Sequence, residues 1–243
     1  MWSLNLETDS IYYEDCIEGI PKRIPENSID LIIADPPFGI EFNGKSALYN
    51  RDSEYVVSGY NEITKNNYSD FTKRWIEVIF PVLKETGSAY IFSGWTNLKD
   101  ILVAIDDAGF KTINHLIWKY QFGVFTKRKF VTSHYHILYI VKNAKKYYFN
   151  KIDHYPEDVF EIKREYLKKE MKNSTKLPDQ LIEKLLLYSS KKNDIVLDPF
   201  MGNGTTAVAC IKHNRKYLGF EKNPNAKEII DSNISRVKEE KNL

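Results

Sequence analysis

The sequence predicts an α/β protein in which helices cover both faces of a mainly parallel sheet. Short apolar runs alternate with amphipathic stretches almost throughout the chain, turn-forming residues bound the runs, and no repeat or low-complexity tract interrupts the pattern. A chain of 243 residues is long enough to bury a full core unaided. We therefore expect a single domain over residues 1–243.

Six segments are expected to form strands, because each is a short apolar run with turn formers close by. They are residues 29–34, 89–92, 113–120, 135–141, 195–197 and 217–220. The amphipathic stretches between them predict helices, and Pro178 and Pro224 suit the first turn of two of these. The expected helices are residues 70–84, 98–108, 178–189, 205–212 and 224–239.

Two polar segments lack a clean period and are expected to form irregular inserts. Residues 41–67 follow a Pro-Pro turn, and residues 144–175 are rich in charge. Long irregular inserts in a compact domain are usually functional. We interpret the first as an active-site and DNA loop and the second as a small target-recognition insert, with plain surface loops as the alternative.

The overall charge does not identify a nucleic-acid partner, and the sequence predicts no membrane protein. The 35 Lys and Arg nearly balance the 33 Asp and Glu, so only local groups such as Lys127, Arg128 and Lys129 point to a polyanion, and a solvated basic face is the alternative. We expect no membrane span and a cytoplasmic location, because the chain has no basic leader with an apolar core and no apolar run of about 18 residues.

The sequence predicts no metal site. The two cysteines lack the spacing of a zinc site, and we expect His134 and His136 on opposite sides of their strand.

The first motif that carries chemistry is Asp35-Pro36-Pro37-Phe38, directly after the strand expected at residues 29–34. The carboxyl ends of strands are where α/β sheets place their sites. Two prolines stiffen the backbone, so that the Asp35 carboxylate and the Pro36 carbonyl form a rigid pair of acceptors for an amino group. Phe38 would stack on a base extruded from a duplex. The alternative is a Pro-Pro turn with a helix-capping aspartate.

The second motif, residues 195–206, is a strand that leads through a glycine turn into a helix. Gly202 and Gly204 allow the backbone to approach a ligand closely, and Glu221 follows the next strand, where it could accept hydrogen bonds from a ribose. The spacing of the glycines also matches a dinucleotide fingerprint, so a nicotinamide or flavin oxidoreductase is the competing class. A dehydrogenase has no use for the first motif, whereas a methyltransferase acting on RNA or protein amines would share it.

The two motifs in this order resemble the DNA amino-methyltransferases in their β arrangement. The resemblance covers nearly the whole chain and includes Asp15-Cys16, residues 80–92, and Leu177-Pro178 before the glycine loop. It implies a Rossmann-like methyltransferase fold with a seven-stranded sheet, circularly permuted so that the catalytic half comes first. It also implies S-adenosyl-L-methionine as the cofactor and double-stranded DNA as the partner.

The resemblance implies a role for each matching position. The catalytic residues would be Asp35, Pro36, Pro37 and Phe38. The cofactor would be held by Asp15, Cys16, Thr175, Asp198, Phe200, Gly202, Asn203, Gly204, Thr205 and Glu221. Among these, Asp15 and the Cys16 backbone would face the adenine edge, Glu221 the ribose, and Thr175 the carboxylate. Asn203 stands where the family more often has serine, and Tyr135 where glutamate is common.

The acceptor base has two interpretations. An aspartate at position 35 is usual for enzymes that methylate adenine N6, whereas residues 43–52, 118–123 and 133–136 look like those of cytosine-N4 enzymes that modify CTAG. We favour cytosine N4. Arg51, Lys127, Arg128 and Lys129 are the candidate DNA contacts, because they lie in the loops that flank the catalytic strands. A homodimer on a palindromic site and a companion restriction endonuclease are compatible with this reading.

Overall fold

An eight-stranded sheet runs through the middle of the protein, in the order β1-β8-β7-β2-β3-β5-β4-β6. The computed structural model describes residues 6–37, 63–121, 123, 126–165 and 176–242. The strands are β1 (Ser10–Tyr12), β2 (Ile29–Ala34), β3 (Leu83–Ser93), β4 (Lys111–Lys119), β5 (His134–Val141), β6 (Val159–Glu161), β7 (Ile195–Asp198) and β8 (Lys216–Phe220). The helices are α1 (Cys16–Arg23), α2 (Tyr68–Val82), α3 (Leu98–Ala108), α4 (Asp179–Ser189), α5 (Thr205–Lys212) and α6 (Lys227–Glu240), with short 3-10 turns η2 (Lys65–Asn67) and η3 (Pro224–Ala226).

The pairing of the strands confirms the α/β prediction. From β1 to β3 all neighbours are parallel, whereas β5 is antiparallel to both β3 and β4. The expected number of seven strands is wrong for the described residues, because β6, which comes from the insert at 144–175, adds an eighth strand beside β4. The circular permutation stays a prediction.

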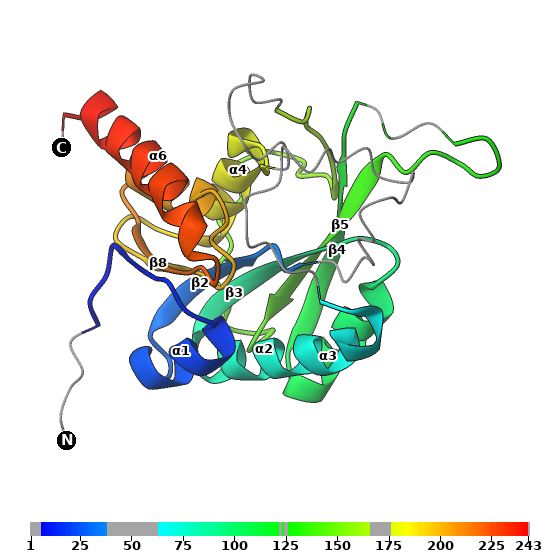
Figure 1. Ribbon diagram of the computed structural model, residues 1–243, viewed down its shortest axis with the longest axis horizontal. Coiled ribbons are helices and arrows are strands. Elements are labelled where there is room, and N and C mark those ends of the chain that lie inside the picture. Colours follow the sequence, from blue (N-terminus) through cyan, green and yellow to red (C-terminus); the bar gives the residue numbers. More distant parts are fainter. Residues whose placement is uncertain (1–5, 38–62, 122, 124–125, 166–175, 243) are drawn as a thin grey trace.

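The sheet is buried on both faces because its central strands carry apolar side chains on both sides. On β2, Leu31 and Ile33 point into one core, and Ile32 and Ala34 point into the other. Helices α1, α2 and α3 cover the second core, and α4, α5 and α6 cover the first (Figure 1). A continuous apolar strand, rather than an alternating one, is what such double burial requires.

Helix α2 ends earlier and β3 begins earlier than the sequence pattern predicts. The helix stops at Val82, and Leu83 is already extended and paired with Ile29. The last carbonyls of the helix, at Pro81 and Val82, accept hydrogen bonds from the backbone N–H groups of Asn27 and Ser28. The chain before β2 therefore ends the helix, and a pattern read along one segment cannot include that contact.

The expectation that His134 and His136 face opposite sides is wrong. Residues two apart on a strand share a face, and the two rings lie 5.0 Å apart. His136 also pairs with His115 across the strands, at 2.7 Å between Nδ1 and Nε2. Among the described residues, no group of three or more His, Cys, Asp or Glu side chains could hold a metal ion. In the same part of the chain, no helix has the length and apolar character to cross a membrane.

The two inserts are described unequally. Most of the loop expected at 41–67 lies outside the described residues. Residues 144–165 of the second insert are described, and they contain β6, which pairs with β4 at the edge of the sheet.

Candidate active site

The two motifs meet because their strands are neighbours in the sheet. β2 and β7 are parallel, with Ile32 opposite Leu197. Asp35 and Phe200 each lie three residues further along the chain, so both leave the sheet at the same edge. The chain continues from β2 to β3 on one side and from β7 to β8 on the other. The site therefore lies at the point where the strand order reverses, which is where open α/β sheets bind ligands.

The first motif emerges directly from the core. Ala34 and Pro36 are buried, while Asp35 and Pro37 are half-buried, and Phe38 lies outside the described residues. The charge of Asp35 reaches the phenol of Tyr68, the first residue of α2. Burial, together with the carboxylates of Asp100 and Asp35, raises the pKa of Tyr68 to about 12, against the hydrogen bonds of Thr72 and Asn97.

Tyr68 is a residue of the site that sequence reasoning missed. It begins a helix after an irregular segment and takes part in no motif. Its side chain is buried at the edge of the sheet where Asp35 emerges. Only its electrostatic interaction with Asp35 could have identified it.

Asp198 holds the shape of the glycine loop rather than facing outward. It is buried, and its two carboxylate oxygens accept hydrogen bonds from the backbone N–H of Phe200 at 2.9 Å and from the Thr206 hydroxyl at 2.6 Å. Burial raises the pKa of Asp198 to about 7, against the effect of these two donors. The carboxylate thus fixes the loop between β7 and α5.

Gly202 and Gly204 give this loop its course. Both adopt positive φ angles, +55° and +78°, in the left-handed region that favours glycine. Gly202 donates its N–H to Glu221 Oε2 at 2.8 Å. A Cβ at Gly202 would meet nothing nearer than the Phe200 carbonyl at 3.7 Å, so one face of this peptide is open. Asn203 and Thr205, which flank Gly204, are buried.

Glu221 links the glycine loop to the next strand. Its second oxygen accepts a hydrogen bond from the Asn223 N–H at 2.8 Å, and burial raises the pKa of its carboxyl group. Phe200 packs edge-on against Trp75 of α2, with ring centroids 5.2 Å apart. The loop is therefore braced by β8 on one side and by α2 on the other.

Asp15 lies at the same edge of the sheet, since β1 is parallel to β8. It caps α1, because Oδ1 accepts from the Ile17 N–H at 2.9 Å, and Oδ2 forms an ion pair with Lys222 at 2.9 Å. Cys16 is buried and burial raises the pKa of its thiol, which excludes a reactive thiolate.

The candidate DNA contacts lie at one end of this edge. Lys127, Arg128 and Lys129 are exposed on the hairpin between β4 and β5, which leaves the same sheet edge as Asp35. Arg51 and Thr175 lie outside the described residues.

Comparisons with known proteins decide the family. Residues 29–232 match the DNA methylase family of N6 and N4 methyltransferases. The chain belongs to this DNA methylase family. The type II methyltransferase M.HinfI of Haemophilus influenzae is 31% identical, over 97% of this chain and 71% of the relative. The type II methyltransferase M.HpaI of Haemophilus parainfluenzae is 33% identical, over 88% of this chain and 72% of the relative.

Solved structures share the fold of this methylase. The M1.HpyAVI-SAM complex superposes with a TM-score of 0.69 at 22% identity, covering 93% of this chain and 98% of the other. The PvuII DNA methyltransferase (cytosine-N4-specific) has a TM-score of 0.70 at 18% identity, covering 95% and 93%. The methylase therefore has the Rossmann-like methyltransferase fold, uses S-adenosylmethionine, and methylates amino groups of DNA bases.

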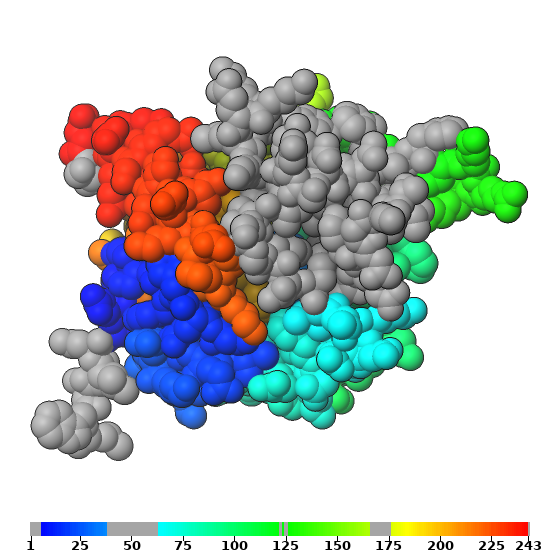
Figure 2. All heavy atoms as spheres, in the orientation of Figure 1, coloured from blue at the N-terminus to red at the C-terminus, as the bar shows by residue number. Residues whose placement is uncertain are grey.

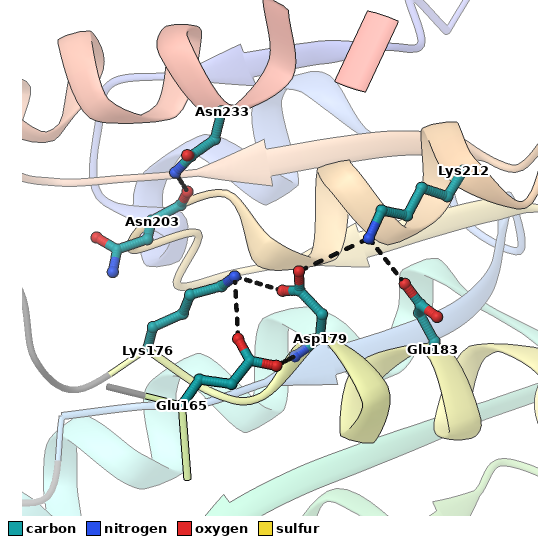
Figure 3. Close-up of polar contacts among 7 residues, drawn as sticks. All are labelled: Glu165, Lys176, Asp179, Glu183, Asn203, Lys212 and Asn233. Atoms are coloured by element: carbon teal, nitrogen blue, oxygen red, sulfur yellow. Dashed lines mark hydrogen bonds and ion pairs between the residues drawn. The ribbon is translucent and has the colours of Figure 1, made fainter. Parts of the chain in front are cut away.

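The site fits this cofactor. The open face of Gly202 admits a ligand against the backbone, and Glu221 offers carboxylate oxygens beside it. The methylase also carries a network of charges next to the glycine loop, which sequence reasoning missed (Figure 3). Lys176, whose side chain is only 11% exposed, contacts Asp179 at 2.5 Å and Glu165 at 3.5 Å, and Lys212 continues the network from Asp179 to Glu183. This network ties the start of α4 to the end of α5.

Proposed function

We propose that this methylase transfers a methyl group to N4 of cytosine in a short duplex site, with CTAG as the first candidate, and acts as the modification enzyme of a restriction-modification system. The observation that carries the proposal is the position of Asp35, at the end of the strand beside the one that leads into the cofactor loop. The likeness of residues 43–52, 118–123 and 133–136 to CTAG-modifying enzymes favours cytosine.

The chemistry follows from the acceptors at Asp35. An exocyclic amino lone pair is delocalised into the ring, so it is a poor nucleophile until it is drawn out of that plane. The Asp35 carboxylate and the Pro36 carbonyl would accept the two N–H bonds and favour a tetrahedral nitrogen. S-adenosylmethionine supplies an electrophilic methyl group on a sulfonium sulfur. The N–C bond forms as the S–C bond breaks, the sulfur keeps the bonding pair as a thioether, and the amino group loses one proton.

Adenine N6 is the second candidate, and Asp35 itself favours it because aspartate is usual at that position in adenine enzymes. Both bases present a planar amino group, so the same pair of acceptors serves either. Phe38 would stack on the extruded base in both cases. The choice between them depends on the pocket around the ring and not on the transfer step.

The direct test is incubation with tritiated S-adenosylmethionine and mixed-sequence duplex DNA, followed by digestion and mass identification of the labelled nucleoside. N4-methylcytosine is the expected product. N6-methyladenine would replace the cytosine proposal by the second candidate. The absence of label in DNA, with label in RNA or protein offered in parallel, would refute both.

The role of Asp35 is tested separately from that of the cofactor site. We expect Asp35→Ala to abolish transfer while the dissociation constant for S-adenosylhomocysteine, measured by calorimetry, changes less than about threefold, because the carboxylate contacts the acceptor and not the cofactor. Asp70→Ala, which removes an exposed carboxylate from α2, is the matched control. Equal losses of cofactor affinity and activity would remove Asp35 from the acceptor role.

DNA phosphates would be neutralised by the basic side chains of Arg51, Lys127, Arg128 and Lys129. An arginine could also recognise guanine through hydrogen bonds to the edge of the base. The described part of the recognition insert is small, so a symmetric dimer on a palindromic site is part of the proposal. Sedimentation with and without duplex DNA tests the dimer.

A further inference from the structure

The hairpin between β4 and β5 is closed near its base and carries a distinct tip. The Tyr120 N–H donates to the Ser133 carbonyl at 3.0 Å, where the two strands end. A Cβ at Gly123 would lie 1.9 Å from the Thr132 carbonyl, so only glycine lets the two arms approach this closely. The tip, residues 126–131, therefore projects from a narrow neck, and it forms part of the green projection at the right of Figure 2.

The tip combines positive charge with an exposed aromatic ring. Lys127, Arg128 and Lys129 are followed by Phe130, and no acidic residue occurs between positions 121 and 133. The Phe130 side chain is 99% exposed, more than any other large apolar side chain among the described residues, the next being Tyr155 at 80%. A phenyl ring held entirely in water at the end of a projection gains nothing for the fold, and an aromatic ring beside a run of cations is the combination with which proteins contact both the bases and the phosphates of nucleic acids.

The hairpin leaves the sheet at the same edge as the proposed catalytic motif. The carboxyl ends of β2, β3 and β4 and the start of β5 share one edge of the sheet. At the base of the hairpin, three strand spacings, or roughly 14 Å, separate β2 from β4. This is less than the diameter of a duplex, so a duplex that lies along this edge of the sheet can extend from Asp35 to the hairpin.

From these observations we propose that Phe130 is a wedge residue: it enters the base stack at the target and occupies the space that the extruded base leaves. Lys127, Arg128 and Lys129 hold the phosphates on either side, since backbone contacts fix a protein on the duplex while apolar side chains unstack its bases. The inference rests on the proposed function of methylating duplex DNA. Phe130 would offset part of the free energy needed to extrude the base, and it would take no part in the transfer step.

The test compares two DNA substrates that differ only in the cost of extrusion. One is a matched duplex, and the other carries an abasic site opposite the target base, which leaves that base unpaired. We expect Phe130→Ala to lower the single-turnover methylation rate on the matched duplex at least tenfold and to approach the wild-type rate, within about twofold, on the second substrate. Phe130→Trp, which keeps a large ring, is expected to retain the wild-type rate on both.

Two further variants define the controls. Val103→Ala removes an exposed apolar side chain from α3 and is expected to change neither rate. Replacement of Lys127, Arg128 and Lys129 by alanine is expected to weaken binding on both substrates alike and to reduce its salt dependence. The wedge is refuted if the wild type methylates DNA and Phe130→Ala has no effect, or loses the same factor on both substrates. If the wild type methylates no DNA, the proposed function fails first and the wedge fails with it.

Discussion

Asp198 should make the stability of the methylase fall as the pH rises from 5 to 7. Burial raises the pKa of its carboxyl group from 3.8 to about 7. Between these values the folded chain binds a proton at Asp198 that the unfolded chain does not, so this contribution to stability is complete below about pH 4 and is lost as the pH passes 7. Asp198→Asn cannot titrate, yet it keeps an acceptor for the Phe200 N–H.

The magnitude follows from the width of the pH interval. Each pH unit well inside it is worth about 1.4 kcal/mol and the last unit less, because the carboxyl group is already half titrated at pH 7. The unfolding free energy of the wild type should therefore fall by about 2 kcal/mol relative to that of Asp198→Asn from pH 5 to pH 7. For a chain of this length that corresponds to roughly 4 to 8 °C in Tm. Calorimetric unfolding of both proteins at constant ionic strength, without cofactor, measures it.

The hydrogen bond from Thr206 provides an internal control. Thr206→Val removes the hydroxyl that stabilises the charged carboxylate, so the interval should extend to higher pH, whereas Thr206→Ser keeps the hydroxyl and should follow the wild type. Parallel Tm profiles for the wild type and Asp198→Asn across pH 5 to 8 would refute the reasoning, because they would mean that the carboxylate is charged in both folded and unfolded chains.

Three other perturbations have defined outcomes. Glu221→Ala removes the carboxylate that accepts from the glycine loop, and should weaken binding of S-adenosylhomocysteine at least tenfold by calorimetry; an unchanged dissociation constant would exclude the ribose assignment. Gly204→Ala should destabilise the fold by about 1 to 2 kcal/mol in urea, since its φ is +78° and its new Cβ would lie 3.2 Å from Ile230. Lys176→Met should cost about 1 to 2 kcal/mol in the same assay, and adding Asp179→Asn should recover part of it if the ion pair is the cause.

The sequence predicted the parts of the fold whose pattern is local. The strands β2, β7 and β8 lie within one residue of their predicted limits because they are mostly apolar, and α3 and α5 have the predicted limits. Helix α1 was missed because it has only 8 residues and contains Pro21. Strand β6 was missed because 3 residues carry no period. The antiparallel placement of β5 between β3 and β4 is a property of the sheet, which no single segment encodes.

The same limit applies to the site. Asp35 and the glycine loop could be predicted because each motif is contiguous, and their meeting follows from the pairing of β2 with β7. The sequence does not state in which direction a side chain points, so the hydrogen bond from Thr206 to Asp198 could not be predicted. The ion pair between Asp15 and Lys222 joins residues that are far apart in the sequence. A cap role for Asp15 had a local signal, since aspartate before a helix often accepts from its first turn.

Both edges of the sheet end in strands of three residues, β1 and β6. The long strand β3, with 11 residues, is paired on both sides, and β4, with 9 residues, is covered by β6 at Ile117, Trp118 and Lys119. Short edge strands offer few free backbone groups to another chain, which limits aggregation through sheet extension. A shortened protein that lacks residues 144–165 would uncover the backbone of β4 where β6 pairs with it, at Ile117, Trp118 and Lys119, and so would lengthen the free edge that another copy of the methylase could extend.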